Sequence, residues 1–202
     1  MNTKSLDTKL DTKQHILQVG YQLITQKGFT AMGLSELLKA AEVPKGSFYH
    51  YFTSKEQFGE ALLQDYFDHY FTRVDALFNA GEGNDYQKMM RYWQYWLELN
   101  SIHCESGQCL VVKLAAEVTD LSEAMRHVML SRTNQVITRI ADGIERGRIN
   151  QSIQVSDSRA TAERLYSLWI GACLLNKIRQ DDSSLQQALT TTEQILTGNP
   201  LS

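Results

Sequence analysis

Apolar residues recur along almost the whole chain with the 3.6-residue period of an α-helix, and no segment alternates like a β-strand flanked by hairpin turns. Early in the chain, for example, Ile16, Val19 and Leu23 fall on one stripe. The only prolines are Pro44 and Pro200, so no proline interrupts the long helices between them. The pattern predicts an all-α fold, with helices over residues 12–27, 33–41, 45–52, 54–77, 85–102, 109–118, 121–147, 158–179 and 184–196.

Local signals predict several of the helix ends. Lys27 followed by Gly28 is typical of a helix C-terminus, where a basic side chain meets the dipole and glycine takes the left-handed turn. Pro44 suits the first helical position of the third predicted helix, over residues 45–52. Ser54 and Gln57 have the S-x-x-Q spacing of a capping box, which indicates that the fourth helix begins there.

The first three helices are closely spaced and joined by tight connections, as in a helix-turn-helix unit whose second helix can enter the major groove of DNA. Lys45 lies in the first turn of the helix over residues 45–52, where its charge meets the positive end of the helix dipole and is mildly unfavourable. A DNA phosphate bound at this end would offset that repulsion. Phe48, Tyr51 and Phe52 are expected to form the apolar side of this helix. Taken singly, its polar residues could be a solvated face, but together with the turn they predict DNA contact. The expected DNA-binding residues are Lys45, Gly46, Ser47, Tyr49, His50 and Lys55.

The N-terminal pattern as a whole resembles the signature of the tetracycline-repressor (TetR) family of regulators. The resemblance covers about residues 12–60. It implies an all-helical homodimer that binds double-stranded operator DNA. Residues 1–60 would form a three-helix, helix-turn-helix DNA-binding domain, and residues 61–202 a helical ligand- or redox-sensing and dimerisation domain. The positions that carry it are Gly28, Phe29, Leu37, Ala41, Val43, Gly46, Tyr49, Phe52, Ser54, Lys55 and Glu56.

Two positions depart from the usual family pattern. Gly33 stands where a serine or threonine is usual, which removes a side-chain cap from the second helix, so no DNA role is assigned to it. Glu42 stands where glycine is usual, so a non-glycine residue must make the turn. Segments within residues 32–52, 107–125 and 168–178 resemble one subgroup of the family that shares both departures. That subgroup implies a repressor of electrophile-detoxifying genes, released when a cysteine is modified by electrophiles or oxidants.

Cys109 is the strongest candidate for such a sensor. It follows a glycine-containing break and is expected to open a helix, where the dipole would stabilise a thiolate and lower its pKa. Lys113 lies four residues later and could share the helix face. Lys177 lies four residues after Cys173, and an ammonium near Cys109 would favour its thiolate. The expected sensing residues are therefore Cys109, Lys177 and Lys113.

The remaining chemistry-bearing residues leave alternatives open. Buried cysteine is most often a small core residue, which we expect for Cys173, whereas Cys104 could be core or exposed. His103 and Cys104 with Cys109 lack a fourth ligand, so no metal site is expected. The aromatic residues of the fifth helix could be core or line an apolar pocket. No cofactor is expected.

The eighth predicted helix carries more apolar groups than an exposed helix needs, which favours a homodimeric four-helix bundle made with the last helix. The alternative is burial within one subunit. The residues on which this expectation rests are Leu165, Leu168, Trp169, Ala172 and Leu175.

Charge and cysteine content bound the function further. The net charge is −3, but residues 1–60 hold seven lysines against six acidic residues, so the acidity belongs to the remainder of the chain. Three cysteines, no apolar signal core and no apolar run of membrane length favour a cytoplasmic protein with free thiols and no membrane partner. Two rivals to the electrophile-released repressor remain: a repressor induced by a small, non-covalent apolar ligand, and a small thiol-dependent enzyme. No cofactor loop, nucleophile elbow or C-x-x-C motif supports the enzyme.

Overall fold

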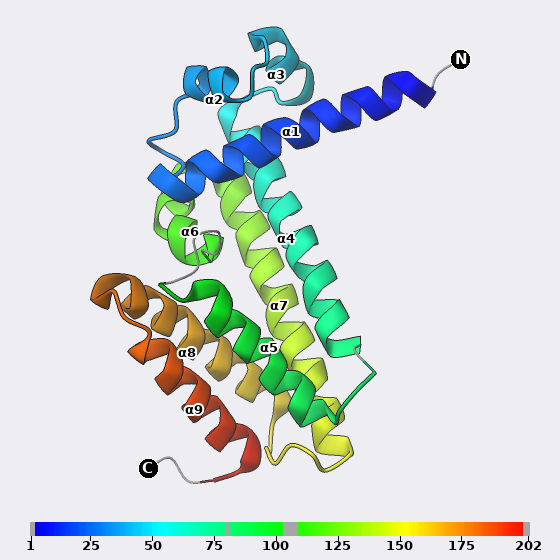
Figure 1. The fold of residues 1–202 in the computed structure, drawn as a ribbon, viewed down its shortest axis with the longest axis vertical. Helices are drawn as coiled ribbons and strands as arrows, with labels where there is room; N and C mark the ends of the chain where they lie inside the picture. Colours follow the sequence, from blue (N-terminus) through cyan, green and yellow to red (C-terminus); the bar gives the residue numbers. More distant parts are fainter. Residues whose placement is uncertain (1–2, 80, 103–108, 200–202) are drawn as a thin grey trace. The chain divides into compact units, whose positions relative to one another are not determined.

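The computed structural model describes residues 3–79, 81–102 and 109–199, and for residues 3–11 the backbone alone. All regular structure in these ranges is helical, as the periodicity predicts, and no strand occurs in them. The first helix begins nine residues earlier than predicted. The helices are α1 (Thr3–Lys27), α2 (Leu34–Ala40), α3 (Lys45–Tyr51), α4 (Lys55–Asn79), α5 (Asp85–Asn100), α6 (Leu110–Leu121), α7 (Glu123–Ile149), α8 (Ser158–Arg179) and α9 (Ser183–Thr197) (Figure 1).

The chain divides into two compact units. The first contains Met1–Asp68 and Lys113–Leu130, and the second contains His69–Val112 and Ser131–Ser202. The helices α4, α6 and α7 each contribute residues to both units. The first unit therefore extends beyond the N-terminal segment and includes most of α6 and the first part of α7.

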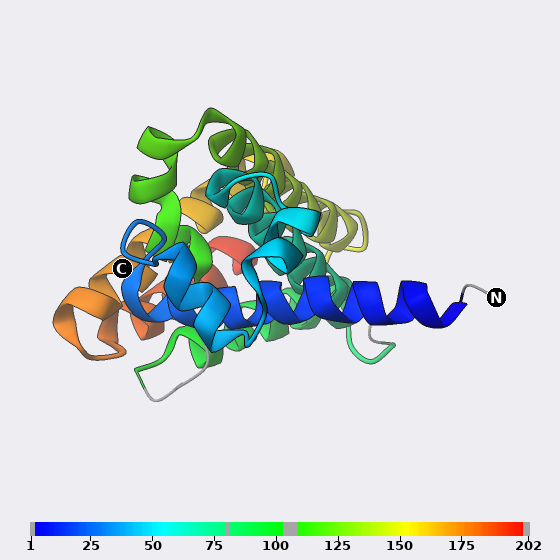
Figure 2. The same cartoon turned by 90° about the horizontal axis from the view of Figure 1, so that it is seen from above.

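In the first unit, α2 and α3 pack against α1, as Figures 1 and 2 both show. The centre of this packing is a group of fully buried phenylalanines: Phe48 of α3 lies 5.7 Å from Phe58 of α4 and 5.2 Å from Phe52, measured between ring centroids. A Cβ atom on Gly20 of α1 would lie 2.3 Å from the Phe58 ring. The glycine therefore lets α1 approach this aromatic core closely.

The helix ends in the first unit follow the sequence signals with two changes. Pro44, predicted at the first helical position, has ψ of 153° and is the N-cap of α3. Gly28 ends α1 in the left-handed region, with φ of +89°. Glu42 also adopts a positive φ, +53°, and so makes the turn in place of glycine. The Ser54 hydroxyl accepts the Gln57 N–H at 3.1 Å, as expected, but the Gln57 side chain accepts the Thr53 N–H at 2.5 Å instead of that of Ser54.

In the second unit, α8 and α9 form an antiparallel pair, and α5 packs against α9. The core is strongly aromatic: Trp93 of α5 stacks on Trp169 of α8 with ring centroids 5.1 Å apart and planes 13° from parallel. Trp169 Nε1 donates to Thr192 Oγ1 of α9 at 2.9 Å. The burial of Tyr92, Trp93 and Trp96 shows that the aromatic side of α5 is core.

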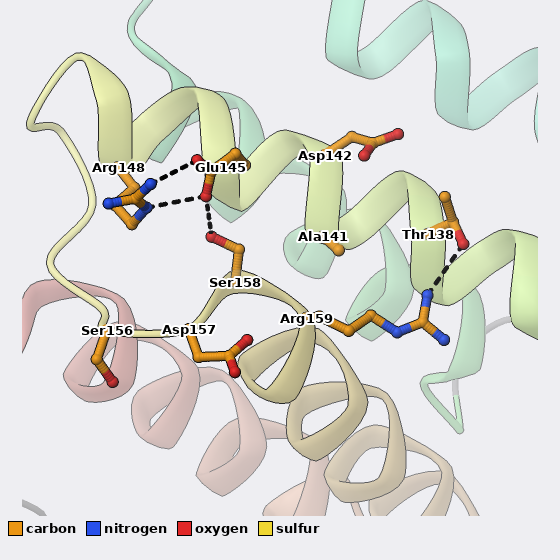
Figure 3. A pocket seen from close by; sticks show the side chains of 9 residues that line it. All are labelled: Thr138, Ala141, Asp142, Glu145, Arg148, Ser156, Asp157, Ser158 and Arg159. Carbon is orange, nitrogen blue, oxygen red and sulfur yellow. Dashed lines mark hydrogen bonds and ion pairs between the residues drawn. The ribbon is translucent and has the colours of Figure 1, made fainter.

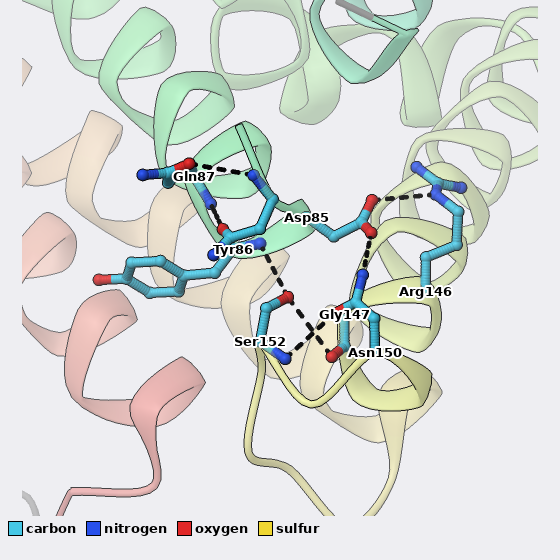
Figure 4. A network of polar contacts seen from close by, with 8 residues as sticks. Asp85, Tyr86, Gln87, Arg146, Gly147, Asn150 and Ser152 are labelled. Atoms are coloured by element: carbon cyan, nitrogen blue, oxygen red, sulfur yellow. Dashed lines mark hydrogen bonds and ion pairs between the residues drawn. The ribbon is translucent and has the colours of Figure 1, made fainter. Parts of the chain in front are cut away.

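A polar network joins the start of α5 to the end of α7 (Figure 4). Asp85 accepts Arg146 Nε at 3.3 Å and Asn150 Nδ2 at 2.5 Å, while the Tyr86 N–H donates to Ser152 Oγ at 3.3 Å. These contacts provide partners for groups at two helix ends that would otherwise lack them. None of the described helices is both long and apolar enough to span a bilayer.

Candidate functional site

The outer face of α3 carries four of the residues expected to contact DNA. Lys45, Gly46, Tyr49 and His50 are exposed, with 47% of Tyr49 accessible, and Ser47 is half-buried. The opposite side of this short helix is anchored in the first unit's core by a fully buried phenylalanine. The helix thus presents hydroxyl, imidazole and ammonium groups on a rigid base.

Two details of this face suit close approach by another molecule. A Cβ atom on Gly46 would meet no described atom within 4 Å, so nothing inside this part of the chain requires the glycine. The Lys45 Nζ atom lies 5.7 Å from the centroid of the Tyr49 ring. This cation–π contact holds a positive charge and a phenol hydroxyl on the same side of the helix.

Lys55 differs from the other expected DNA contacts because it already interacts with residues of the α1–α2 connection. Its Nζ atom donates to the Thr30 carbonyl at 3.3 Å and lies 4.8 Å from the Phe29 ring centroid. Burial lowers the pKa of Lys55, while the carboxylates of Glu56 and Glu117 oppose that shift. Lys55 is a half-buried cation at the start of α4, and its contact with a phosphate stays a prediction.

Cys109 lies in the second unit, immediately before α6, and only 5% of it is exposed. Its N–H donates to Asn100 Oδ1 at 3.0 Å, and the Asn100 carbonyl accepts Asn176 Nδ2 at 2.9 Å. Asn100 therefore joins the start of α6 to α8. The local fold holds the thiol at the junction of α5, α6 and α8.

Opposing influences act on the Cys109 thiol. Burial raises its pKa, whereas the N–H groups of Val112 and Val111 and the Lys177 ammonium lower it. The helix-start effect expected from the sequence is present, but burial outweighs it, so the expectation of a lowered pKa is wrong. Lys177 is thus close enough to act electrostatically on Cys109, and its role in sensing stays a prediction.

A hydrogen-bonded chain of aromatic side chains lies beside this thiol. The Tyr70 and Tyr92 hydroxyls are 2.6 Å apart, and Trp96 Nε1 donates to Tyr70 Oη at 2.8 Å. Burial raises the pKa of Tyr70, and the negative charge that Cys109 carries when ionised raises it further. Ionised Cys109 likewise adds to the raised pKa of Tyr166.

Cys173 belongs to the same buried group, and its pKa is raised as well. It is 2% exposed, and burial is the largest cause of its raised pKa, with ionised Cys109 adding to the shift and Lys177 opposing it. Its burial fits the core role expected from the sequence. Lys113 is half-buried on α6, and its expected role beside Cys109 stays a prediction. His103 and Cys104 lie outside the described residues, and the described ranges hold no cluster of metal-binding side chains.

The apolar face of α8 divides between core and surface. Leu165, Trp169 and Ala172 are buried within the subunit, which is the alternative that the sequence left open for them. Leu175, by contrast, is 41% exposed, and the neighbouring Ile178 is 69% exposed. The exposed apolar residues of this helix are Leu174, Leu175 and Ile178.

An open pocket of about 510 Å³ lies between the end of α7 and the start of α8 (Figure 3). Its polar groups pair with one another: Glu145 accepts Arg148 Nη2 and Ser158 Oγ, each at 2.6 Å, and Arg159 Nη1 donates to Thr138 Oγ1 at 3.0 Å. The hydrogen bonds from Arg148 and Ser158 hold the pKa of Glu145 down to about 2. The pocket is therefore a polar contact between two helices of the second unit.

Sequence reasoning missed the residues that position the thiol. Asn100 sits at the last turn of α5, and its local sequence gives no sign of a contact with α6 or α8. Asn176 offers a weak signal, because it directly follows the apolar run of residues 168–175; in the structure it is 2% exposed. Tyr70 falls on the predicted apolar stripe, which indicates burial and not hydrogen bonding.

Comparison with known proteins gives consistent matches along the chain. The family model for bacterial regulatory proteins of the tetR family matches residues 16–62, and the model for the tetracyclin repressor-like C-terminal domain matches residues 86–192. The chain is 45% identical over 190 residues to the HTH-type transcriptional repressor NemR of Escherichia coli, which covers 94% of this chain and 96% of the relative. It is 32% identical over 167 residues to the transcriptional regulator AcuR of Cereibacter sphaeroides, covering 82% and 76%. The crystal structure of the reduced form of E. coli NemR is similar, with a TM-score of 0.88 and 46% identity over 95% of this chain and 100% of that chain.

Proposed function

The chain belongs to the TetR family of bacterial regulatory proteins and is a DNA-binding transcriptional repressor; from this premise we propose that covalent modification of Cys109 releases it from its operator. Regulators of this family bind operator DNA and work as dimers. The outer face of α3 would enter the major groove through Lys45, Gly46, Ser47, Tyr49 and His50, with Lys55 on a nearby phosphate. Residues 1–60 would serve as the DNA-binding domain and residues 61–202 as the sensing and dimerisation domain.

The observation that carries the sensing proposal is a buried thiol at a junction of three helices, with the charge of Lys177 acting to lower its pKa. The Cys109 thiolate would attack an electron-poor alkene such as a maleimide. An S–C bond forms, the alkene π electrons move toward the adjacent carbonyl, and the resulting enolate takes a proton from water. Lys177 supports this step because its positive charge favours the thiolate.

The adduct must then displace its surroundings. Cys109 is closely packed, and extra atoms in such a site force neighbouring side chains and backbone to shift. Because α6 starts at the next residue, its first turn is the element most directly displaced. The modified state would favour an arrangement that no longer fits two half-sites of the operator, which is a shift in population between two states.

Dimerisation is proposed through the exposed apolar side of α8. Leu174, Leu175 and Ile178 form an apolar patch whose burial against a second copy is favourable. A two-fold contact along α8 and α9 would fix the separation of the two α3 helices. A repressor of this kind acts where the DNA is, so a cytoplasmic location is part of the proposal.

The proposal is tested with a duplex selected from a random-sequence library by the wild-type protein. N-ethylmaleimide should weaken binding by wild-type protein and by Cys173→Ser by about tenfold or more, while Cys109→Ser keeps its affinity. Release of Cys109→Ser to the wild-type extent would remove Cys109 from the mechanism. Wild-type binding that N-ethylmaleimide does not change would instead favour the rival proposal of a non-covalent apolar inducer.

A further inference from the structure

The connection between α1 and α2 is held by a carboxylate from α6. The Thr30 N–H donates to Glu117 Oε2 at 2.9 Å, although the two residues are 87 positions apart in the chain. The same carboxylate lies against Gly28: a Cβ atom there would be 2.4 Å from Glu117 Oε1 and 3.0 Å from Oε2. Gly28, with φ of +89°, therefore provides both the left-handed turn and the space that the carboxylate occupies.

A second side chain, from the start of α4, also binds the connection between α1 and α2. The Lys55 ammonium donates to the Thr30 carbonyl at 3.3 Å and is also attracted electrostatically to Glu117. The N–H and the C=O of one residue, Thr30, are thus held by two side chains of opposite charge. Hydrogen bonds with one charged partner are stronger than neutral ones, so this pair fixes the connection more firmly than a turn alone would.

Phe29, the residue before Thr30, is tightly packed. Phe29 is 2% exposed. A Cβ atom on Gly59 of α4 would lie 2.8 Å from the Phe29 ring and 2.6 Å from the Met125 side chain of α7. Phe29 therefore lies where α4 and α7 come close, and residues 28–30 have little freedom while Glu117 stays in place.

We propose that Glu117 is the positioning residue through which α6 sets the helix-turn-helix, a proposal that rests on the function given above. The helix α6 starts directly after Cys109 and carries Glu117 two turns later, so a single helix connects the thiol to this carboxylate. A shift of α6 that withdraws the carboxylate leaves the Thr30 N–H without its acceptor and leaves Lys55 with Glu56 as the remaining carboxylate that acts on it. The connection that leads into α2 and α3 is then released.

The first test measures how strongly thiol modification and DNA binding are coupled. The selected duplex is titrated with each protein before and after reaction with N-ethylmaleimide, and the ratio of the two Kd values is compared. We expect a ratio of about ten or more for wild type and for Asp120→Ala, which removes an exposed carboxylate from the same helix. Glu117→Ala should reduce the ratio to below about three, and Glu117→Gln, whose amide oxygen can still accept the Thr30 N–H, should keep most of it. A wild-type ratio in Glu117→Ala would overturn the proposal and leave the proposed function intact.

The second test does not depend on the inducer. Hydrogen exchange of the Thr30 amide should be at least about tenfold faster in Glu117→Ala than in wild type, with no change in Asp120→Ala. If wild-type protein does not release DNA after modification, the proposed function fails, but this measurement still tests whether Glu117 fixes the connection at Thr30. Unchanged exchange at Thr30 would overturn the role proposed for Glu117. If Glu117→Ala melts below the assay temperature, Glu117→Met serves in its place, because it removes the acceptor but keeps the length of the side chain.

Discussion

On α3, the side chains expected to act face solvent and rest on a buried phenylalanine, whereas around Cys109 they are buried and held by partners far away in the chain. Side chains on the α3 face can therefore be replaced without changing the fold beneath them. At the thiol site, by contrast, any change of volume or charge acts on the packing of three helices. The difference separates the residues proposed to bind DNA from the residue proposed to sense electrophiles.

The largest effect we expect comes from removing the anchor of the binding face. Phe48→Ala leaves a cavity in the aromatic core of the first unit, where the side chain is fully buried. The free energy of unfolding should fall by about 3–5 kcal/mol, because Phe-to-Ala changes in cores lose both burial and packing. Chemical denaturation followed by circular dichroism measures this loss. A loss below about 1 kcal/mol would mean that α3 does not depend on this anchor.

The neighbouring residue should behave in the opposite way. Tyr49→Ala removes an exposed side chain, so the melting temperature should stay close to that of wild type. Affinity for the selected duplex should fall by about 1–3 kcal/mol if Tyr49 makes a specific contact. Fluorescence anisotropy and a thermal melt on the same samples separate the two effects. Full affinity in this variant would exclude Tyr49 as a contact.

The smallest of these effects tests the charge next to the thiol. Lys177→Met keeps an unbranched stem but removes the ammonium that lowers the pKa of Cys109. The pKa should rise, less thiolate should be present at pH 7, and alkylation by N-ethylmaleimide should slow by up to about tenfold. The pH profile of the rate should move to higher pH. Lys88→Met, a change on α5, is the matched control and should leave the profile where it is in wild type.

The contrast between the two regions also explains what the sequence could predict. The α3 face was predictable because its turn, its anchor and its polar groups lie within a few residues of one another. The positive φ of Glu42 was expected for the same reason, since the turn is local. The 3.6-residue period of apolar positions is likewise a local signal, and it predicted the helices of the described residues.

Features that depend on distant residues were predicted less well. The start of α6 indicated a stabilised thiolate, but burial by α5 and α8 reverses the direction of the pKa shift at Cys109. Leu165 and Trp169 indicated a dimer surface, yet tertiary packing places both inside the subunit. The contact between Glu117 and Thr30 has no local signature, because it joins residues that only the fold brings together.

The most direct test of the account follows modification and release in the same sample. Wild-type protein bound to the selected duplex is treated with increasing N-ethylmaleimide, and at each step the fraction of DNA released and the fraction of Cys109 alkylated are measured by anisotropy and peptide mass spectrometry. Release should rise in proportion to alkylation of Cys109. Release while Cys109 is still unmodified, or complete alkylation of Cys109 with the DNA still bound, would contradict the role proposed for this thiol.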